Sequence, residues 1–184
     1  MKRFIFLCFI VLSACNQNQE KAEQPVEPLY DYDVEERLEE LNITLIPSPP
    51  PVANYVNAVK TGNLMFLAGK GPTLAEGGYI TGKVGVDLTI EEGYEAARRT
   101  GIVQLSVLKH ELGDLNKVVR IVKVLGMVNA DSSFTQHPEV INGFSDVMVE
   151  VFGDRAKHAR AAVGMGSLPR NIACEIEMIV EVQE

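Results

Sequence analysis

The fold is decided near the end of the chain, by Ile172-Ala173-Cys174-Glu175-Ile176-Glu177-Met178-Ile179-Val180-Glu181-Val182. Apolar side chains occupy every second position, and Glu175, Glu177 and Glu181 fall between them. Successive side chains of a strand point to opposite faces of a sheet, so this alternation predicts a strand with one face on a core and carboxylates on the other. Cys174 lies on the apolar face, which indicates a small core residue rather than a nucleophile.

Two amphipathic helices are expected before this strand. Thr89 begins a T-x-x-E capping box, and apolar residues then recur at spacings of three and four until Gly113. A second such pattern has Pro138 in its first turn and ends at Gly153.

Further strands are expected at residues 63–68, which are apolar, and 118–128, which are rich in β-branched side chains. The glycine-rich section 69–85 is expected to hold turns and a hairpin. This order of elements predicts an α+β fold in which two helices pack on one face of a mixed sheet. Two helices cannot cover both faces, so oligomerisation through the sheet is the economical way to cover the other.

The N-terminus resembles an export signal. Lys2 and Arg3 precede an apolar run of nine residues, far short of the roughly 20 that a membrane-spanning helix needs, and Leu-Ser-Ala-Cys15 follows. This ending is similar to the bacterial lipobox, which predicts removal of residues 1–14 and lipidation of Cys15; an ordinary signal peptide is the alternative. A lipid anchor would place the protein on a membrane, on the periplasmic or outer-membrane side.

The rest of the chain divides into two parts. Residues 15–42 are expected to hold the lipidated cysteine, a polar linker and a short helix with Asp33 as its N-cap. Residues 43–184 have ordinary globular composition and suit one domain.

Composition argues against several classes of function. The net charge of the full chain is −8, and removal of residues 1–14 leaves 15 cationic side chains against 25 carboxylates, or −10, which makes nucleic acid a poor partner. Cys174 would then be the only thiol, so no intramolecular disulfide is expected. The three histidines lack metal-ligand spacing, and no nucleotide or serine-hydrolase motif is found, so neither a metal nor a cofactor is expected.

The strongest resemblance lies in the stretch from His158 to Pro169 together with the final strand. An arginine in a strand, an apolar residue three positions later, Leu-Pro and then an alternating strand with glutamate resemble the closing signature of the Rid family, also called YjgF or L-PSP proteins. Earlier fragments agree in order and spacing, and the resemblance covers about residues 43–184: Asn54-Tyr55-Val56, Thr61-Gly62-Asn63 and Phe66-Leu67-Ala68-Gly69.

This resemblance implies a chorismate mutase-like α+β fold, a homotrimer with ligand clefts between subunits, and hydrolysis of 2-imino or enamine acids to 2-oxo acids and ammonia. It gives Arg160 the role of binding the substrate carboxylate, for which a guanidinium fork is suited, and Glu175 that of orienting water or relaying a proton. Four further residues would line the cleft: Tyr55, Gly69, Asn142 and Ala162. A structural ion pair for Arg160, an interface carboxylate for Glu175 and a half-buried aromatic for Tyr55 are the alternatives.

Several positions depart from the pattern of active members. Ala161 and Ala162 stand where Ser or Thr and then Cys are usual, Ala68 replaces a Ser, Lys70 a Gln and His158 a Pro. These departures indicate a divergent branch of the family. A noncatalytic protein that binds a small carboxylate-bearing metabolite on the same scaffold is therefore the alternative to a deaminase. Endoribonuclease activity is disfavoured by the acidic net charge.

Overall fold

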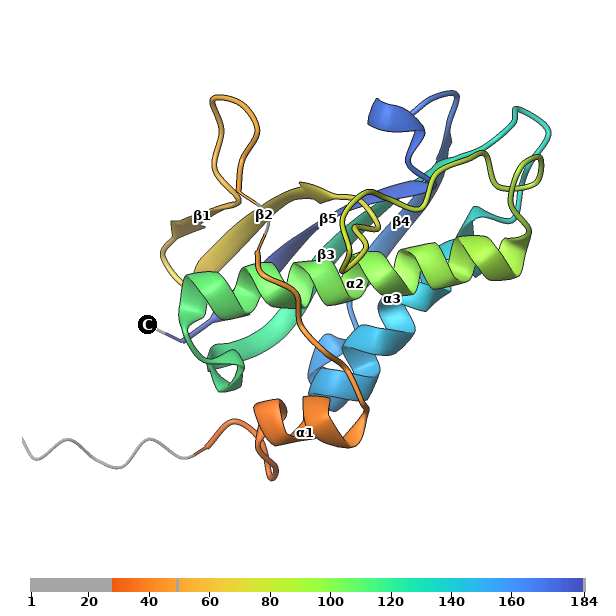
Figure 1. Cartoon of the computed structure of the whole chain (residues 1–184). Helices are drawn as coiled ribbons and strands as arrows, with labels where there is room; N and C mark the ends of the chain where they lie inside the picture. Colours follow the sequence, from red (N-terminus) through yellow and green to blue (C-terminus); the bar gives the residue numbers. More distant parts are fainter. Residues whose placement is uncertain (1–27, 49, 184) are drawn as a thin grey trace, which may run out of the picture.

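A computed structural model describes residues 28–48 and 50–183. The expected signal peptide at 1–14, Cys15 and the linker as far as residue 27 lie outside the described residues. The described part is one sheet with helices against one of its faces (Figure 1), so the fold class predicted from the sequence is confirmed. None of the helices in residues 28–48 and 50–183 is long and apolar enough to cross a membrane.

The sheet contains five strands in the order β1-β2-β5-β3-β4. Neighbours run antiparallel except β3 and β4, which are parallel. The alternating strand β5 is therefore hydrogen-bonded on both sides, by β2 and by β3. The strands are β1 (Ala58–Thr61), β2 (Leu64–Lys70), β3 (Val118–Asn129), β4 (Ala159–Met165) and β5 (Cys174–Val182).

Two long helices cover one face of this sheet (Figure 1). Helix α2 (Ile90–Leu112) packs on β2 and β5, and α3 (His137–Phe152) packs on β3 and β4. The short α1 (Val34–Glu40) packs against α3. The even-numbered side chains of β5 face the helices and are all buried, Cys174 among them, as the alternation predicts.

The predicted ends of the long helices are confirmed. The Thr89 hydroxyl accepts from the Glu92 N–H at 3.2 Å, and the Glu92 carboxylate accepts from the Thr89 N–H at 2.8 Å, so both halves of the capping box form. Gly113 ends α2 in the left-handed region at φ 72°, which glycine adopts without steric cost. Helix α3 has Pro138 in its first turn and ends before Gly153.

The hairpin lies elsewhere than expected. After the end of β2 at Lys70, section 69–85 forms isolated bridges: Thr73 with Tyr79 and Thr81 with Ile172 are antiparallel, and Val84 with Leu88 and with Ala130 are parallel. The regular hairpin is β1–β2, which turns at Gly62 with φ 57°. Strand β1 was not predicted because it is only four residues long and lies at the sheet edge, where its largely exposed side chains show no core-facing alternation.

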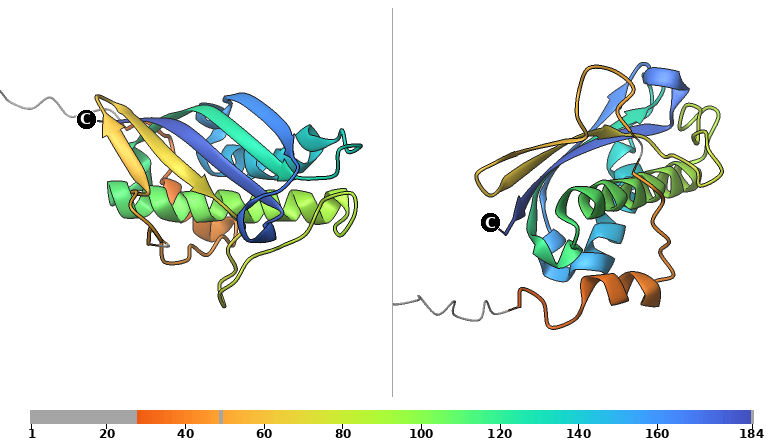
Figure 2. Two further views of the ribbon diagram at one scale, coloured as in Figure 1. Left: turned by 90° about the horizontal axis from the view of Figure 1, so that it is seen from above. Right: turned by 60° about the vertical axis from the view of Figure 1, so that its left-hand side comes forward.

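Within the described residues, no helix covers the other face of the sheet (Figure 2, left). Phe66 and Val163 on this face are 43% and 40% exposed. A hollow of about 550 Å³ lies between strands, lined by Phe66, Leu125, Ala161 and Ile179 among others. Large apolar groups in an open hollow are typical of surfaces that associate.

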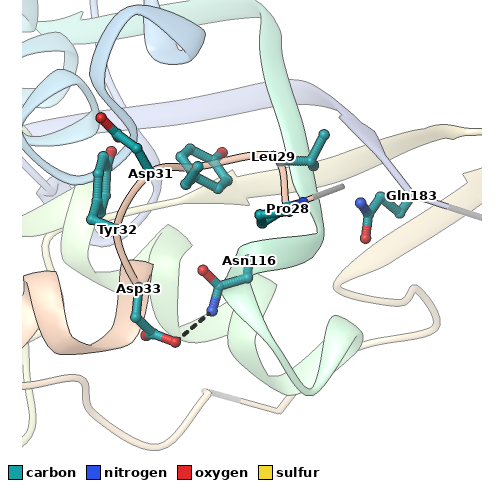
Figure 3. A pocket seen from close by; sticks show the side chains of 8 residues that line it. Pro28, Leu29, Asp31, Tyr32, Asp33, Asn116 and Gln183 are labelled. Carbon is teal, nitrogen blue, oxygen red and sulfur yellow. Dashed lines mark hydrogen bonds between the residues drawn. The ribbon is translucent and has the colours of Figure 1, made fainter. Parts of the chain in front are cut away.

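The segment before α1 packs on the domain. The Tyr30 hydroxyl donates to the Val118 carbonyl at 2.5 Å, and Arg155 Nε donates to the Leu29 carbonyl at 3.0 Å. Asp33 caps α1 by accepting from two backbone N–H groups, and its other oxygen accepts from Asn116 Nδ2 at 3.2 Å (Figure 3). The chain is thus held from residue 29 onward.

Gly143 offers a test of the packing between the two long helices. A Cβ at this position would overlap the Tyr94 carbonyl oxygen, which belongs to the backbone of α2 and cannot rotate away. Gly143→Ala is expected to lower the free energy of unfolding by about 1–3 kcal/mol through overpacking, despite the roughly 1 kcal/mol by which alanine favours a helix. Gly166→Ala is the control, because a Cβ there meets nothing within 4 Å. Urea unfolding of both variants measures the difference, and a Gly143→Ala protein as stable as wild type would refute the close packing.

Candidate functional site

Glu175 lines a small cavity of about 250 Å³ beside the ends of β2 and β5. Three of the residues expected at the site, Glu175, Gly69 and Tyr55, share this cavity within one chain. Tyr55 is 46% exposed at its wall. Lys70, Tyr79 and Arg170 also line it.

The backbone around Gly69 is shaped to accept the Glu175 side chain. A Cβ at Gly69 would overlap the Glu175 carboxylate, so glycine leaves the space that this carboxylate occupies. The register of β2 against β5 shifts between Leu67 and Lys70, which marks a bulge. The buried amide of Gln104 on α2 holds the bulge by donating to the Ala68 carbonyl at 3.0 Å and to the Ile176 carbonyl at 2.8 Å.

The cavity disfavours charge on both of its interior ionisable groups. Lys70 is only 9% exposed, and its Nζ donates to Asn57 Oδ1 at 2.6 Å. Burial lowers the pKa of Lys70, and the nearby Glu175 opposes this in part. Burial raises the pKa of Glu175, to which Glu177 adds and which Lys70 opposes. A carboxyl with a raised pKa keeps a proton to higher pH, as a general acid requires.

Arg160 lies elsewhere, in a polar cluster between β4 and α3. Its Nη1 donates to Asn142 Oδ1 at 3.0 Å and to Ser145 Oγ at 2.9 Å, and its Nη2 donates to the Pro138 carbonyl at 3.4 Å. A guanidinium has five N–H donors, so two remain. No carboxylate within residues 28–48 and 50–183 pairs with it.

His158 contacts this cluster through Ser145. Its Nδ1 lies 2.6 Å from the Ala156 carbonyl, which can only accept, so Nδ1 carries the proton. Burial lowers the pKa of His158, the hydrogen bond to Ala156 opposes this, and Arg160 lowers it further. The neutral ring can therefore accept from Ser145 Oγ at 3.2 Å, which leaves the Ser145 oxygen to accept from Arg160.

The sheet register puts Arg160 and Glu175 on opposite faces. Arg160 pairs with Val124 of β3, which is buried under the helices, whereas Glu175 pairs with Met127. Val124 and Met127 are three positions apart in a regular stretch of strand, so their side chains point to opposite sides. Ala162 pairs with Gly126 and lies on the same side as Arg160.

A single chain therefore places the residues expected at the site in two separate groups, the half-sites of the expected arrangement. One joins Glu175, Gly69 and Tyr55 at the cavity, and the other joins Arg160 and Asn142 beside α3, with Ala162 two residues along β4. Strand β3 separates them, because it lies between β5 and β4 (Figure 1). Neither half brings the guanidinium and the carboxylate of the expected pair together.

Other candidate sites contain none of the expected residues. A hollow of about 600 Å³ is lined by the N-terminal segment, Asn116 and Gln183 (Figure 3). No cluster of histidine, cysteine or acidic side chains suited to a metal occurs within the described ranges 28–48 and 50–183. Burial raises the pKa of the Cys174 thiol to about 12, which leaves it unreactive.

The sequence did not predict that Gln104 and Lys70 contribute to the cavity around Glu175. The one signal for Gln104 is that it interrupts the apolar stripe of its helix between Gly101 and Leu108. Lys70 stands out as a cation between two glycines, but its burial depends on contacts with Asn57 that no local pattern indicates.

Comparison with known proteins covers nearly the whole described domain. The family model described as "YjgF/chorismate_mutase-like, putative endoribonuclease" matches residues 35–182. Protein TCP17 of Trypanosoma cruzi is 40% identical over 146 residues, 79% of this chain and 91% of the relative. A 2-iminobutanoate/2-iminopropanoate deaminase of Dermatophagoides farinae is 28% identical over 138 residues, 74% of this chain and 91% of the relative.

The fold has a match among solved structures as well. The crystal structure of a protein of unknown function from Agrobacterium tumefaciens is 40% identical, with a TM-score of 0.75 over 82% of this chain and 94% of that one. The family match, the relatives and the five-stranded mixed sheet agree with one another. The chain therefore belongs to the Rid, or YjgF, family of chorismate mutase-like α+β domains.

Proposed function

We propose that this protein hydrolyses reactive 2-imino or enamine acids to 2-oxo acids and ammonia. The observation that carries the proposal is Glu175: a half-buried carboxyl with a raised pKa, seated over Gly69 in a small cavity. The similarity to a 2-iminobutanoate/2-iminopropanoate deaminase supports the same reaction.

The reaction needs one proton donor and acceptor near the imine carbon. The water oxygen adds to this carbon and a tetrahedral amino alcohol forms. The carbon–nitrogen bond then breaks, and its electron pair leaves with the protonated nitrogen as ammonia. An oxygen lone pair forms the C=O bond while the hydroxyl loses its proton. Glu175 would supply the proton that the leaving amine takes and would recover one from the attacking water, so the carboxyl ends as it began.

The substrate carboxylate would bind Arg160. Its two remaining N–H donors can form a bidentate pair with one carboxylate, while Asn142 and Ser145 fix the plane of the guanidinium. Because Arg160 and Glu175 face opposite sides of the sheet, the complete site would need Arg160 of one copy and Glu175 of another. A homotrimer closed through the uncovered sheet face would supply both and would bury Phe66 and Val163.

A noncatalytic carboxylate-binding protein is the second candidate. It is favoured by Ala162, which lies on the same side of β4 as Arg160 and whose methyl group offers no hydrogen bond to a substrate there. This reading keeps Arg160 as the binding group and gives Glu175 no chemical role. A measurement of ammonia release from an imino acid separates the two functions.

We also propose that the protein is a lipoprotein tethered through Cys15 on the periplasmic or outer-membrane side of a bacterial envelope. The support is the order of cations, short apolar run and Leu-Ser-Ala-Cys at the N-terminus. A tether over residues 15–27 would reach at most about 45 Å from the membrane, because an extended chain spans about 3.3–3.6 Å per residue.

Imine hydrolysis can be tested with an imino acid generated in situ by an amino-acid oxidase, while ammonia release is followed. Wild type is expected to accelerate release above buffer. Glu175→Gln, which keeps the shape and removes the proton, is expected to lower kcat by about 10²–10⁴-fold. Arg160→Ala is expected to raise KM, since it removes a group that binds the substrate in both ground and transition states.

Arg120→Ala is the matched control for the loss of an arginine, because Arg120 is a 61% exposed side chain on β3. It should behave as wild type. Ammonia release at the buffer rate by all four proteins would reject the deaminase, and binding of 2-oxobutanoate that Arg160→Ala abolishes would then establish the binding protein.

The lipid anchor predicts a change in fractionation. Cys15→Ser removes the only thiol at the expected cleavage site and should move the protein from the membrane fraction to the soluble envelope fraction in a bacterial host. Cys8→Ser, within the apolar run that is expected to be removed, should leave it in the membrane fraction. Equal membrane association of all three proteins would contradict lipidation at Cys15.

A further inference from the structure

Lys70 is buried without a carboxylate in ion-pair contact among the described residues. Its Nζ donates to the neutral Asn57 Oδ1 at 2.6 Å, and no carboxylate in the described part of the chain lies within 4.0 Å of it. Lys109 and Lys157 differ, because they pair with Glu35 and Asp154, and Lys60 is exposed. A buried ammonium without a counter-charge is costly, and the usual response is to lose the proton.

A neutral amine at this position would be a nucleophile. A hydrogen bond donated to Asn57 uses an N–H and leaves the nitrogen lone pair available. Lys70 lines the same 250 Å³ cavity as Glu175, so a molecule in the cavity meets an amine and a carboxyl together. Burial lowers the pKa of Lys70, in keeping with this geometry.

We propose that Lys70 forms a Schiff base with small 2-oxo acids bound in the cavity that it shares with Glu175. This goes beyond imine hydrolysis and does not require it, because the bond forms between the lysine and a carbonyl compound. A carbonyl carbon is the electrophile that matches a neutral amine.

The step balances without any further reactant. The Lys70 nitrogen adds to the carbonyl carbon, and a proton moves from nitrogen to the new alkoxide, which gives a carbinolamine. Glu175 protonates the hydroxyl, water leaves, and the nitrogen lone pair forms the C=N bond. The iminium then returns a proton to Glu175, so the net change is one water released for one imine formed.

Arg170 lines the same cavity and provides a cation for a carboxylate on the ligand. Arg170 adopts the left-handed φ of 56°, its Nη1 donates to the Tyr79 hydroxyl at 2.6 Å, and its guanidinium lies 5.5 Å from the Tyr79 ring centroid. No ion pair occupies it within the described ranges. Arg170 therefore has a backbone conformation that is unusual for arginine. Its guanidinium is held by Tyr79 and retains N–H donors that can bind an anion.

Reductive trapping tests the proposal on the full protein. Wild type is incubated at pH 7 with 2-oxobutanoate and sodium cyanoborohydride, which reduces a Schiff base to a stable secondary amine. Peptide mapping by mass spectrometry then measures the labelled fraction of each lysine. Lys70 is expected to be labelled at least about tenfold faster than Lys60 or Lys157, because an ordinary lysine with pKa near 10.4 is almost wholly protonated.

Two variants and one probe complete the test. Lys70→Arg keeps a cation but loses the nucleophile and should reduce labelling of the protein to the background of the surface lysines, whereas Lys60→Arg should leave it unchanged. Butanone, which lacks the carboxylate, should label Lys70 more slowly than 2-oxobutanoate. The wild-type map decides the matter even if Lys70→Arg folds poorly.

Labelling spread evenly over the lysines would overturn the proposal, and equal labelling by butanone would overturn the 2-oxo acid class. Ammonia release in the imine assay is measured separately. A protein that hydrolyses imines without trapping at Lys70 would therefore reject only the Schiff base, and trapping without ammonia release would reject only the deaminase.

Discussion

The two-residue period of side chains along β5 is the constraint on which the rest of the structure depends. One set of positions, from Cys174 to Val182, is buried beneath the helices, and the other set must then face away from them. This places Glu175 on the side without helices, while the same register, carried across β3, places Arg160 under α3. The alternation in β5 therefore determines both which side chains form the core and which face carries Glu175. A shift of the register by one residue would move each of these side chains to the other face of the sheet.

The division of the site follows from this constraint. Glu175 has the cavity, the bulge held by Gln104 and the amine of Lys70, whereas Arg160 has Asn142, Ser145 and the neutral His158. The uncovered sheet face and the separated half-sites have the same economical solution, a second copy that packs there. The proposed trimer and the proposed reaction therefore both require the same contact, in which a second copy packs on the uncovered sheet face. Lys70 adds a group that can act within one chain, since it shares a cavity with Glu175.

Much of this fold could be predicted from the sequence because its signals are local. Capping at Thr89, the glycine after α2 and the alternation in β5 each depend on residues within one helix or strand, and all three were confirmed. Strand β1 was missed because four residues at an edge show no periodicity. The site was less predictable: Arg160 and Glu175 could be named by resemblance, but their placement on opposite faces depends on pairing through β3. The burial of Lys70 likewise depends on Asn57, 13 positions away.

If one copy supplies Arg160 and another supplies Glu175 to each site, as proposed, mixed oligomers of two inactive variants should regain activity. At a substrate concentration far below the raised KM of Arg160→Ala, the Arg160→Ala and Glu175→Gln proteins are each expected to show little imine hydrolysis. Refolded together in equal amounts, they should recover about a quarter of the wild-type activity, because random assembly leaves that share of sites with both residues intact. Mixed oligomers, identified by native mass spectrometry, that show no recovery of activity would contradict the account, as would an active wild-type monomer.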